Sequence, residues 1–367
     1  MPKMRKKIAL MTYHYDSCIQ RAMCFIKHGS DYDIELVFFF EYHNEEIHVA
    51  EKIDQIRQEM SPFSNVKVSL HHTFSVEDFD LVLPMTDKLG PKWLNLCYPG
   101  ITNLNDKRVL QQEILKFGKL NYLKSNATHK LTDFQDSDDV IMKPTIASGS
   151  WSDNPKCYQK IKFDEVKEFF FDTNFVIQDY VDSENICMIS YMSDGTELIM
   201  YDITEQECKK SPSGNFYFSH MLTGLKFKDK YPDLVELGKQ FLCSAGYKNV
   251  RTIYNIQYLL TDQGAFMIDV NLRSGPVVVA IELKELFTGK IFKNGIHFLM
   301  GENQVKEELT NLDTYVGYQL FAVDMNTSKP LTNKVIDINM NTAISITENK
   351  NSGVFRNDVQ VFIQPQQ

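Results

Sequence analysis

The chain has 367 residues, of which 43% are hydrophobic and 24% are charged, which is an ordinary globular composition. Its formal net charge of −9 argues against binding along nucleic acid or to an anionic membrane, because both need a basic face. We therefore expect neither nucleic acid nor a membrane as a partner. A chain of this length can hold two or three modest domains, or one enzyme with several lobes.

Cysteine usage and the first residues bear on the compartment. The seven cysteines are scattered, odd in number and without a CxxC pair, which favours reduced thiols. The basic residues 1–7 are followed by a short apolar run, Ile8–Met11, which is too short for a signal-peptide core. No run of the sequence approaches the roughly 18 apolar residues of a membrane span. We expect a cytoplasmic protein.

Residues 1 to about 100 alternate expected strands with expected helices. The strands are expected at Lys6–Thr12, Ile34–Phe40, Val66–Leu70 and Leu81–Pro84. This alternation predicts βαβ units and a small parallel sheet. The first strand–helix turn, residues 13–18, lacks the glycine fingerprint of a dinucleotide fold. The region is therefore predicted to be Rossmann-like without the cofactor signature.

A stretch near residue 260 is predicted to form a β-hairpin. Two alternating runs, Tyr254–Leu260 and Ala265–Val270, flank the polar turn Thr261–Gly264. Because side chains alternate faces along a strand, Asp269 and Asn271 are expected to point to the same side.

The side chains on this hairpin suit a metal ion and a phosphate group. Gln257 on the first strand can face the same side as Asp269, and Arg273 follows just past the end of the second strand. Oxygen ligands beside one cation suit Mg²⁺ that carries a polyphosphate, because Mg²⁺ is hard and binds few protein carboxylates. Taken alone, the stretch fits an ordinary amphipathic hairpin with a solvated edge equally well.

A second stretch, Val140–Trp151, joins an expected strand to a loop of small residues. Lys143 lies at the end of the strand, and Gly149 lies within the loop. Such loops let backbone N–H groups approach phosphates, and a nearby ammonium adds positive charge. A lone glycine is weak evidence for a phosphate cradle, so a structural turn is the alternative.

A third stretch, Phe175–Glu184, runs from an apolar strand into a polar hinge. The backbone around Asp179 and Val181 can pair with a flat heterocycle, and Glu184 can accept hydrogen bonds from ribose hydroxyls. The alternative is an exposed strand end with solvated acids.

The order of these stretches, with a lysine-bearing helix ahead of them, resembles the ATP-grasp enzymes. That helix is expected over Asn105–Phe117, with Asn103 or Asn105 as its cap. In the local sequence of these motifs, the chain is most similar to the type of domain found in the carbamoyl-phosphate synthase large subunit. The resemblance spans roughly residues 80–300, and its matching segments are Asn105–Lys107, Met142–Ser150, Ile177–Glu184, Asn255–Gln257 and Ile268–Arg273.

This resemblance implies an α/β chain with the three-lobed ATP-grasp fold. Residues 1–100 would form an N-terminal Rossmann-like (pre-ATP-grasp) lobe, and residues 101–180 a linker helix and the small lid lobe. Residues 181–367 would form the large lobe with a strand-rich C-terminal tail. ATP would lie between the small and large lobes.

The resemblance also implies roles for individual residues. The ATP contacts would come from Lys107, Lys143, Ser148, Gly149, Ser150, Gln178, Asp179, Tyr180, Val181, Glu184 and Lys210. In this set the lysines and the loop hold the phosphates, residues 178–181 form the adenine hinge, and residue 184 binds the ribose. Mg²⁺ would be held by Gln257, Asp269 and Asn271. The catalytic residues would be Lys143 and Arg273, the latter acting on the transferring phosphoryl group or the substrate carboxylate.

The sequence departs from the family pattern at three of these positions. Asp269 stands where a glutamate is usual, Leu272 where a proline is common, and Gln178 where an acid is frequent. The shorter aspartate still ligates Mg²⁺ well, so we expect activity to be retained.

The predicted function is an ATP- and Mg²⁺-dependent carboxylate–amine ligase. Phosphorylation turns a carboxylate oxygen into a leaving group, and an amine then attacks the acyl phosphate to give an amide. The acid would be a small metabolite, an amino acid or a peptide, and a homodimer is one option for the assembly. The alternative function is an ATP-grasp subunit that binds a nucleotide, or transfers a phosphoryl group, without ligation inside a larger assembly.

Overall fold

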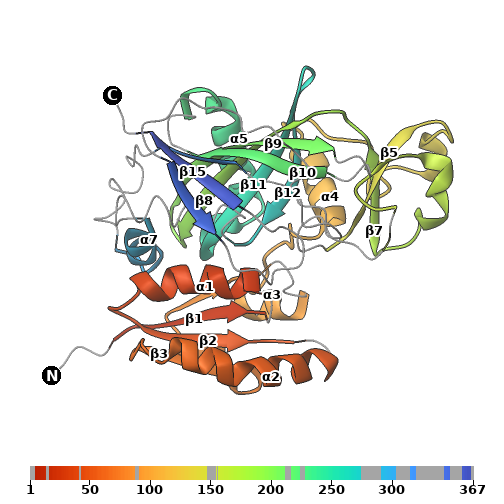
Figure 1. Ribbon diagram of the computed structural model, residues 1–367. Coiled ribbons are helices and arrows are strands. Elements are labelled where there is room, and N and C mark those ends of the chain that lie inside the picture. Colours follow the sequence, from red (N-terminus) through yellow and green to blue (C-terminus); the bar gives the residue numbers. More distant parts are fainter. Residues whose placement is uncertain are drawn as a thin grey trace.

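Three β-sheets organise the chain in the computed structural model, as Figure 1 shows. The structure describes residues 5–13, 16–40, 43–86, 91–146, 154, 156–210, 216–223, 228–273, 291–302, 315–319, 343–347 and 358–364. Within these ranges no helix is long and apolar enough to cross a membrane.

The N-terminal part is a four-stranded parallel sheet in the order β3-β2-β1-β4. Its strands are β1 (Lys7–Thr12), β2 (Asp33–Phe38), β3 (Val66–Leu70) and β4 (Leu81–Pro84), and its helices are α1 (Asp16–His28), α2 (His43–Met60) and α3 (Pro91–Cys97). Strands β1 and β4 are almost entirely apolar and buried. Helices α1 and α2 both pack on the face of the sheet that carries Ile8 and Leu10, whereas α3 packs on the opposite face. The predicted small parallel sheet is confirmed.

The linker helix α4 (Lys107–Phe117) begins two residues later than predicted. Asp106 is its cap, because this carboxylate accepts hydrogen bonds from two backbone N–H groups of the first turn. The prediction that Asn103 or Asn105 caps the helix is therefore wrong. The physical reason is that the side-chain oxygen of Asn105 accepts a hydrogen bond from the distant backbone N–H of Leu272, at 3.3 Å.

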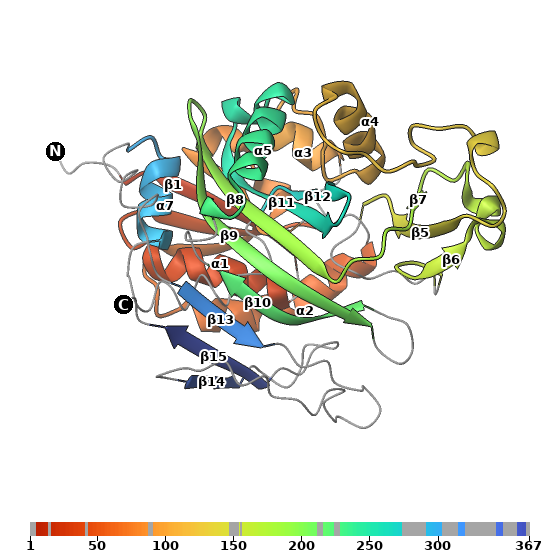
Figure 2. The same cartoon turned by 90° about the horizontal axis from the view of Figure 1, so that it is seen from above.

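The small lobe contains a three-stranded antiparallel sheet in the order β6-β5-β7. Its strands are β5 (Asp139–Pro144), β6 (Lys160–Lys162) and β7 (Phe175–Asp179). One face of this sheet packs on an aromatic cluster in which the rings of Phe134, Phe163 and Phe170 contact one another. This separate core lets the small lobe hold its own shape beside the large sheet, and it projects to one side in Figures 1 and 2.

The large sheet has eight antiparallel strands in the order β12-β11-β8-β9-β10-β13-β15-β14. Their bounds are β8 (Asn185–Asp194), β9 (Leu198–Lys210), β10 (Phe216–Thr223), β11 (Arg251–Thr261), β12 (Gly264–Asn271), β13 (Tyr315–Gln319), β14 (Ala343–Thr347) and β15 (Asp358–Gln364). Strands β8, β9 and β10 pair in sequence, β11 pairs with β12, and β15 pairs with both β13 and β14. Figure 2 shows the long central strands crossing the molecule.

The two faces of the large sheet bury different partners. Helix α5 (Pro232–Ser244) packs on one face, where the hydroxyl groups of Tyr191 and Tyr258 donate to backbone carbonyls of that helix. Gly238 permits this close approach, because a Cβ at this position would lie 2.5 Å from the Tyr191 hydroxyl. The other face shares a core with the N-terminal sheet and with α7 (Ile291–Leu299).

Candidate functional site

The hairpin formed by β11 and β12 presents its polar side chains on one face, as predicted. Gln257 pairs with Asp269 in the strand register, and Asn255 pairs with Asn271, so all four side chains point to the same side. A register shift follows Gln257, and the strands turn through Asp262–Gln263 into a glycine with a φ of +115°. The predicted hairpin and the shared face of its polar residues are therefore confirmed.

An ion pair joins this hairpin to the start of the linker helix. The Nζ atom of Lys107 lies 3.4 Å from Oδ1 of Asp269, and the two side chains are 8% and 22% exposed. The backbone N–H of Lys107 also donates to the carbonyl of Thr145 at the end of β5, at 2.9 Å. One residue therefore contacts both the large lobe and the small lobe.

A second lysine reaches the same place from the small lobe. Lys143 lies on β5, and its ammonium donates to Oε1 of Gln178 on the neighbouring strand β7, at 3.3 Å. The pKa of Lys143 is lowered to about 8, first by burial and then by the positive charge of Lys107, while Asp269 opposes the shift. The two cations are therefore close enough to repel each other around one carboxylate.

Buried amides lie behind this charged cluster. The Nη2 atom of Arg273 donates to Oδ1 of Asn271 at 3.5 Å, and both side chains are buried. The Nδ2 atoms of Asn271 and Asn105 are buried and have no hydrogen-bond partner among the residues that the structure describes. Sequence reasoning gave Asn105 only a role as a possible helix cap, although the segment Asn105–Lys107 matches the family pattern.

The donor set around Asp269 fits Mg²⁺ bound to a polyphosphate. Gln257, Asp269 and Asn271 offer oxygen atoms, and one of the three is a carboxylate, as hard Mg²⁺ ions need when phosphates supply further ligands. No group of three or more His, Cys, Asp or Glu side chains able to hold a metal occurs in the described part of the chain. A metal held mainly by its own polyphosphate is therefore the arrangement that these residues suit.

The predicted adenine hinge lies where β7 ends. Gln178 is 2% exposed, and its Nε2 atom has no hydrogen-bond partner among the described residues. The backbone N–H of Asp179 donates to the carbonyl of Lys124 at 2.8 Å, and that of Tyr180 donates to the carbonyl of Asp139 at 2.9 Å. Neither of these two N–H groups is therefore free to bind an adenine base. The groups that remain for the base are the carbonyls of these residues and the backbone of the residues after Tyr180.

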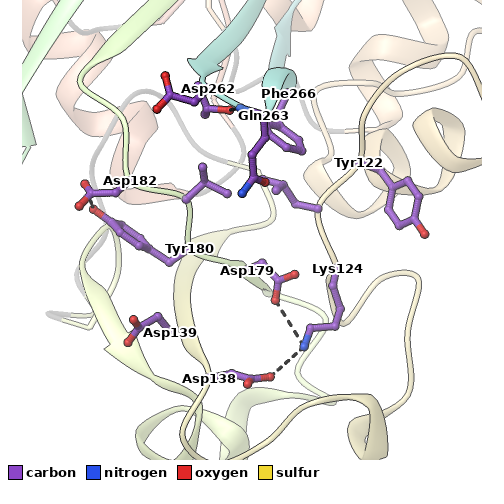
Figure 3. Close-up of a pocket in the computed structure, with 13 residues that line it drawn as sticks. Tyr122, Lys124, Asp138, Asp139, Asp179, Tyr180, Asp182, Asp262, Gln263 and Phe266 are labelled. Carbon is purple, nitrogen blue, oxygen red and sulfur yellow. Dashed lines mark hydrogen bonds and ion pairs between the residues drawn. The ribbon is translucent and has the colours of Figure 1, made fainter.

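A cavity of about 630 Å³ lies beside the same hinge, as Figure 3 shows. Its lining includes Asp179, Tyr180 and Val181 from the predicted hinge, together with the tip of the β11–β12 hairpin. Lys124 lies in this cavity and forms ion pairs with Asp138 at 2.8 Å and with Asp179 at 3.5 Å. Sequence reasoning missed Lys124, because no motif marks it and its partners lie on other segments.

Lys143 and Gln178 point to one face of the small sheet, whereas the cavity lies at the end of the sheet and is lined by residues of both orientations, such as Asp139 and Asp179. Gln178 is the register partner of Ile141, and Asp179 is the register partner of Val140, so these neighbouring positions point in opposite directions. The face with Gln178 carries the cation of Lys143, and the opposite face, with Val140 and Ile177, packs on the aromatic cluster.

The remaining predicted residues are placed only in part. Glu184 is exposed in the connection between β7 and β8, so its ribose contact stays a prediction. Lys210 ends strand β9, but the structure does not describe its side chain. The phosphate loop at Ser148, Gly149 and Ser150 lies outside the described residues.

No family model matches the sequence, and no curated protein matches it. The L-amino acid ligase from Bacillus licheniformis is similar in structure, with 15% identity, a TM-score of 0.56 and coverage of 88% of this chain and 82% of that one. Biotin carboxylase from Campylobacter jejuni, in a β-γ-ATP complex, has 13% identity, a TM-score of 0.58 and coverage of 98% and 88%. N5-carboxyaminoimidazole synthetase from Staphylococcus aureus, complexed with ADP, has 9% identity, a TM-score of 0.56 and coverage of 100% and 96%. These similarities show that the chain has the three-lobed ATP-grasp fold.

Proposed function

We propose that the protein is an ATP- and Mg²⁺-dependent ligase that joins the carboxylate of a small metabolite, amino acid or peptide to an amine. The observation that carries the proposal is the cluster of Lys107, Lys143 and Asp269, which converges from the linker helix, the small lobe and the hairpin. Proteins of similar structure include an amino acid ligase and a synthetase solved with ADP. Two neighbouring ammonium groups beside a single carboxylate leave an excess of positive charge, which a bound polyanion would neutralise.

The two lysines would neutralise the phosphate oxygens of ATP. Phosphoryl transfer needs little covalent work from a protein, and catalysis comes from positioning and from charge opposite the equatorial oxygens. Lys143 is held by Gln178, and Lys107 is held by Asp269 and by the start of its helix, so both ammonium groups have defined positions. Gln257, Asp269 and Asn271 would hold Mg²⁺, which would supply further positive charge against the phosphates.

Arg273 would act on the group that receives the phosphate. Arg273 is 6% exposed and its guanidinium donates to Asn271, so the direction of the guanidinium is set before any ligand binds. A planar guanidinium forms paired hydrogen bonds with a carboxylate or with a phosphoryl group. It would therefore hold the substrate carboxylate, or the phosphoryl group in transfer, on the side of the metal ligands.

The test is ADP release with Mg²⁺ and ATP across a panel of amino acids and small carboxylic acids, with hydroxylamine as the nucleophile. Hydroxylamine captures acyl phosphates as hydroxamates, so the assay identifies the acid before the amine is known. Acid-dependent ADP and hydroxamate would support ligation. ATP binding without acid-dependent turnover would favour the alternative function, a nucleotide-binding or phosphoryl-transfer subunit of a larger assembly.

A pair of aspartate variants checks the site assignment in the same assay. Asp269→Ala removes the carboxylate that pairs with Lys107, and it should abolish turnover while the fold remains intact. Asp54→Ala is the matched control, because Asp54 is an 81% exposed residue of α2 that pairs only with Arg57 among the described residues. Unchanged turnover in Asp269→Ala would refute the metal assignment.

A further inference from the structure

A row of buried polar side chains crosses the large sheet beside the proposed metal ligands. Its members are register partners on the neighbouring strands β12, β11, β8 and β9, which lie side by side in Figure 2: Asn271, Asn255, Ser190 and Asp202. Register partners point to the same side of a sheet, and each of the four residues is at most 3% exposed. Burying polar groups costs stability unless partners satisfy them, so the partners of this row decide what it is for.

The polar row lies between the predicted metal ligands and an apolar core. On the side nearer the hinge, the next row of the sheet carries Gln257 and Asp269. On the other side, Ile253 of β11 pairs with Met192 of β8, and both side chains belong to the core that the large sheet shares with the N-terminal sheet. A molecule bound over the polar row would therefore lie next to the metal site, on the side away from the predicted adenine hinge.

The two asparagines of the row leave complementary groups unused. Asn255 donates from Nδ2 to Oγ of Ser190 at 3.1 Å, and its Oδ1 atom has no hydrogen-bond partner among the residues that the structure describes. Asn271 accepts from Arg273 through Oδ1 at 3.5 Å, and its Nδ2 group likewise has no partner in the described ranges. An unused acceptor and an unused donor therefore belong to register partners without bonding to each other. A network that served the fold alone would join them, because nearly all buried polar groups are paired.

Opposite charges mark the two ends of the row. The guanidinium of Arg273 lies at the β12 end, and Asp202 lies at the β9 end, where its carboxylate accepts from the hydroxyl of Thr204 at 3.2 Å. A ligand that meets both asparagines needs a donor and an acceptor only a few bonds apart, because adjacent strands are about 4.8 Å apart. The field along the row favours positive charge on the donor and negative charge on the acceptor. The ammonium and carboxylate groups of an α-amino acid meet both conditions.

We propose that the row binds the acid substrate as a zwitterionic α-amino acid, whose ammonium group donates to Oδ1 of Asn255 and whose carboxylate accepts from Nδ2 of Asn271 and from Arg273. The inference rests on the proposed ligase function and narrows the acid to one with a free α-amino group. The carboxylate then lies beside the metal ligands, where the proposed phosphoryl transfer takes place. An ammonium group held in this way has no lone pair, so it does not compete with the incoming amine for the acyl phosphate.

The experiment compares amino acids with their des-amino analogues in the hydroxylamine assay with Mg²⁺ and ATP. The pairs include L-alanine with propionate, L-valine with isovalerate and L-glutamate with glutarate, and every amino acid of the panel is paired in the same way. For each amino acid that the native protein turns over, kcat/KM should exceed that of its analogue about tenfold to a hundredfold. This ratio is the effect of one charge-assisted hydrogen bond in a buried site.

Two substitutions of Asn255 distinguish an acceptor from a donor. Asn255→Asp offers acceptor atoms only and adds a negative charge, so it should keep or raise the preference for the amino acid. Asn255→Leu keeps the size without a polar atom, so it should lower kcat/KM for the amino acid and reduce the preference to about twofold or less. A purely structural role would lower kcat/KM for both members of a pair alike, so the ratio separates binding from a disturbed fold.

Asn95→Asp is the matched control for the added charge. Asn95 is exposed on α3, and its Oδ1 atom accepts from the backbone N–H of Gly100 at 3.3 Å, which an aspartate can also do. This variant carries the same negative charge outside the polar row. It should keep the native ratio between each amino acid and its analogue.

The outcomes separate this inference from the proposed function. Equal kcat/KM for an amino acid and its analogue in the native protein, or turnover of des-amino acids alone, would overturn the inference and leave the ligase function in place. A preference that persists in Asn255→Leu would overturn it as well, because another group would then hold the ammonium. The same loss in Asn255→Asp as in Asn255→Leu would show that Asn255 acts as a donor, which contradicts the proposal. A native protein that turns over no member of any pair would overturn the proposed function and this inference with it.

Discussion

Replacing Lys143 by methionine should make the protein more stable and a poorer ATP binder. The pKa of Lys143 is lowered from 10.5 to about 8, first by burial and then by Lys107. At about 1.4 kcal/mol per pKa unit, the charged form costs the folded state about 3 kcal/mol near pH 7. Water still reaches part of this side chain and screens the charge, so we expect Lys143→Met to raise the free energy of unfolding by about 1–3 kcal/mol.

The sign of this effect gives it a characteristic pH dependence. The folded protein releases the Lys143 proton near pH 8, whereas the unfolded chain keeps it until about pH 10.5. The cost of the charge is therefore complete below pH 8 and disappears as the pH rises from 8 to 10.5. The gain in stability of Lys143→Met should be largest at pH 7 and fall by more than half at pH 9.5.

Urea unfolding of the native protein and of Lys143→Met at both pH values measures this gain, and calorimetry measures ATP affinity. We expect affinity to fall about tenfold to a hundredfold, because a charge-assisted hydrogen bond to phosphate is lost. Lys116→Met is the control, since Lys116 is 76% exposed on α4 and should show neither change. A less stable Lys143→Met at pH 7, or the same difference at both pH values, would refute this reasoning.

Three further substitutions test how the site is supported, each by urea unfolding. Gly238→Ala should lower the free energy of unfolding by about 1–3 kcal/mol, because the new methyl group would lie 2.5 Å from the Tyr191 hydroxyl; unchanged stability would contradict the close packing of α5. Asp106→Ala should cost about 1 kcal/mol through loss of the α4 cap, and Asp106→Asn should restore most of it. Lys124→Met should lower the free energy of unfolding by about 1–2 kcal/mol at pH 7 and by less near pH 4. The loss should shrink because burial already raises the pKa of Asp179, so this carboxylate becomes protonated at low pH and no longer needs a partner. An equal loss at both pH values would disprove the ion-pair explanation.

The hairpin was predictable because its information is local. Alternation along residues 254–271 fixes which side chains share a face, and the polar turn fixes which strands pair. These two facts place Gln257 opposite Asp269 without any knowledge of the rest of the fold. Only the register shift after Gln257 has no signal in the alternation.

The contacts that assemble the site were not predictable from local patterns, because they join distant segments, and only the family resemblance placed Lys107 and Asp269 in one site. Asn105 accepts the N–H of Leu272 across 167 positions, and Lys107 meets Asp269 across 162. No pattern in the sequence says which of several polar residues near a helix start will cap it and which will reach another strand. The error in the helix cap and the missed role of Asn105 have this one cause.

The charged cluster is better explained by what it is expected to bind than by what it does for the fold. Lys143 has a lowered pKa, and the buried amides of Gln178 and Asn271 each keep a donor with no partner in the described part of the chain. Each of these features lowers the stability of the free protein, and a stable core would avoid them. A polyphosphate with a purine base would offset several of them together, by neutralising the lysines and accepting a hydrogen bond from at least one amide. Several unfavourable groups that lie together and that one ligand can neutralise are typical of a binding site. Here the ligand that would do so has the shape and charge of ATP.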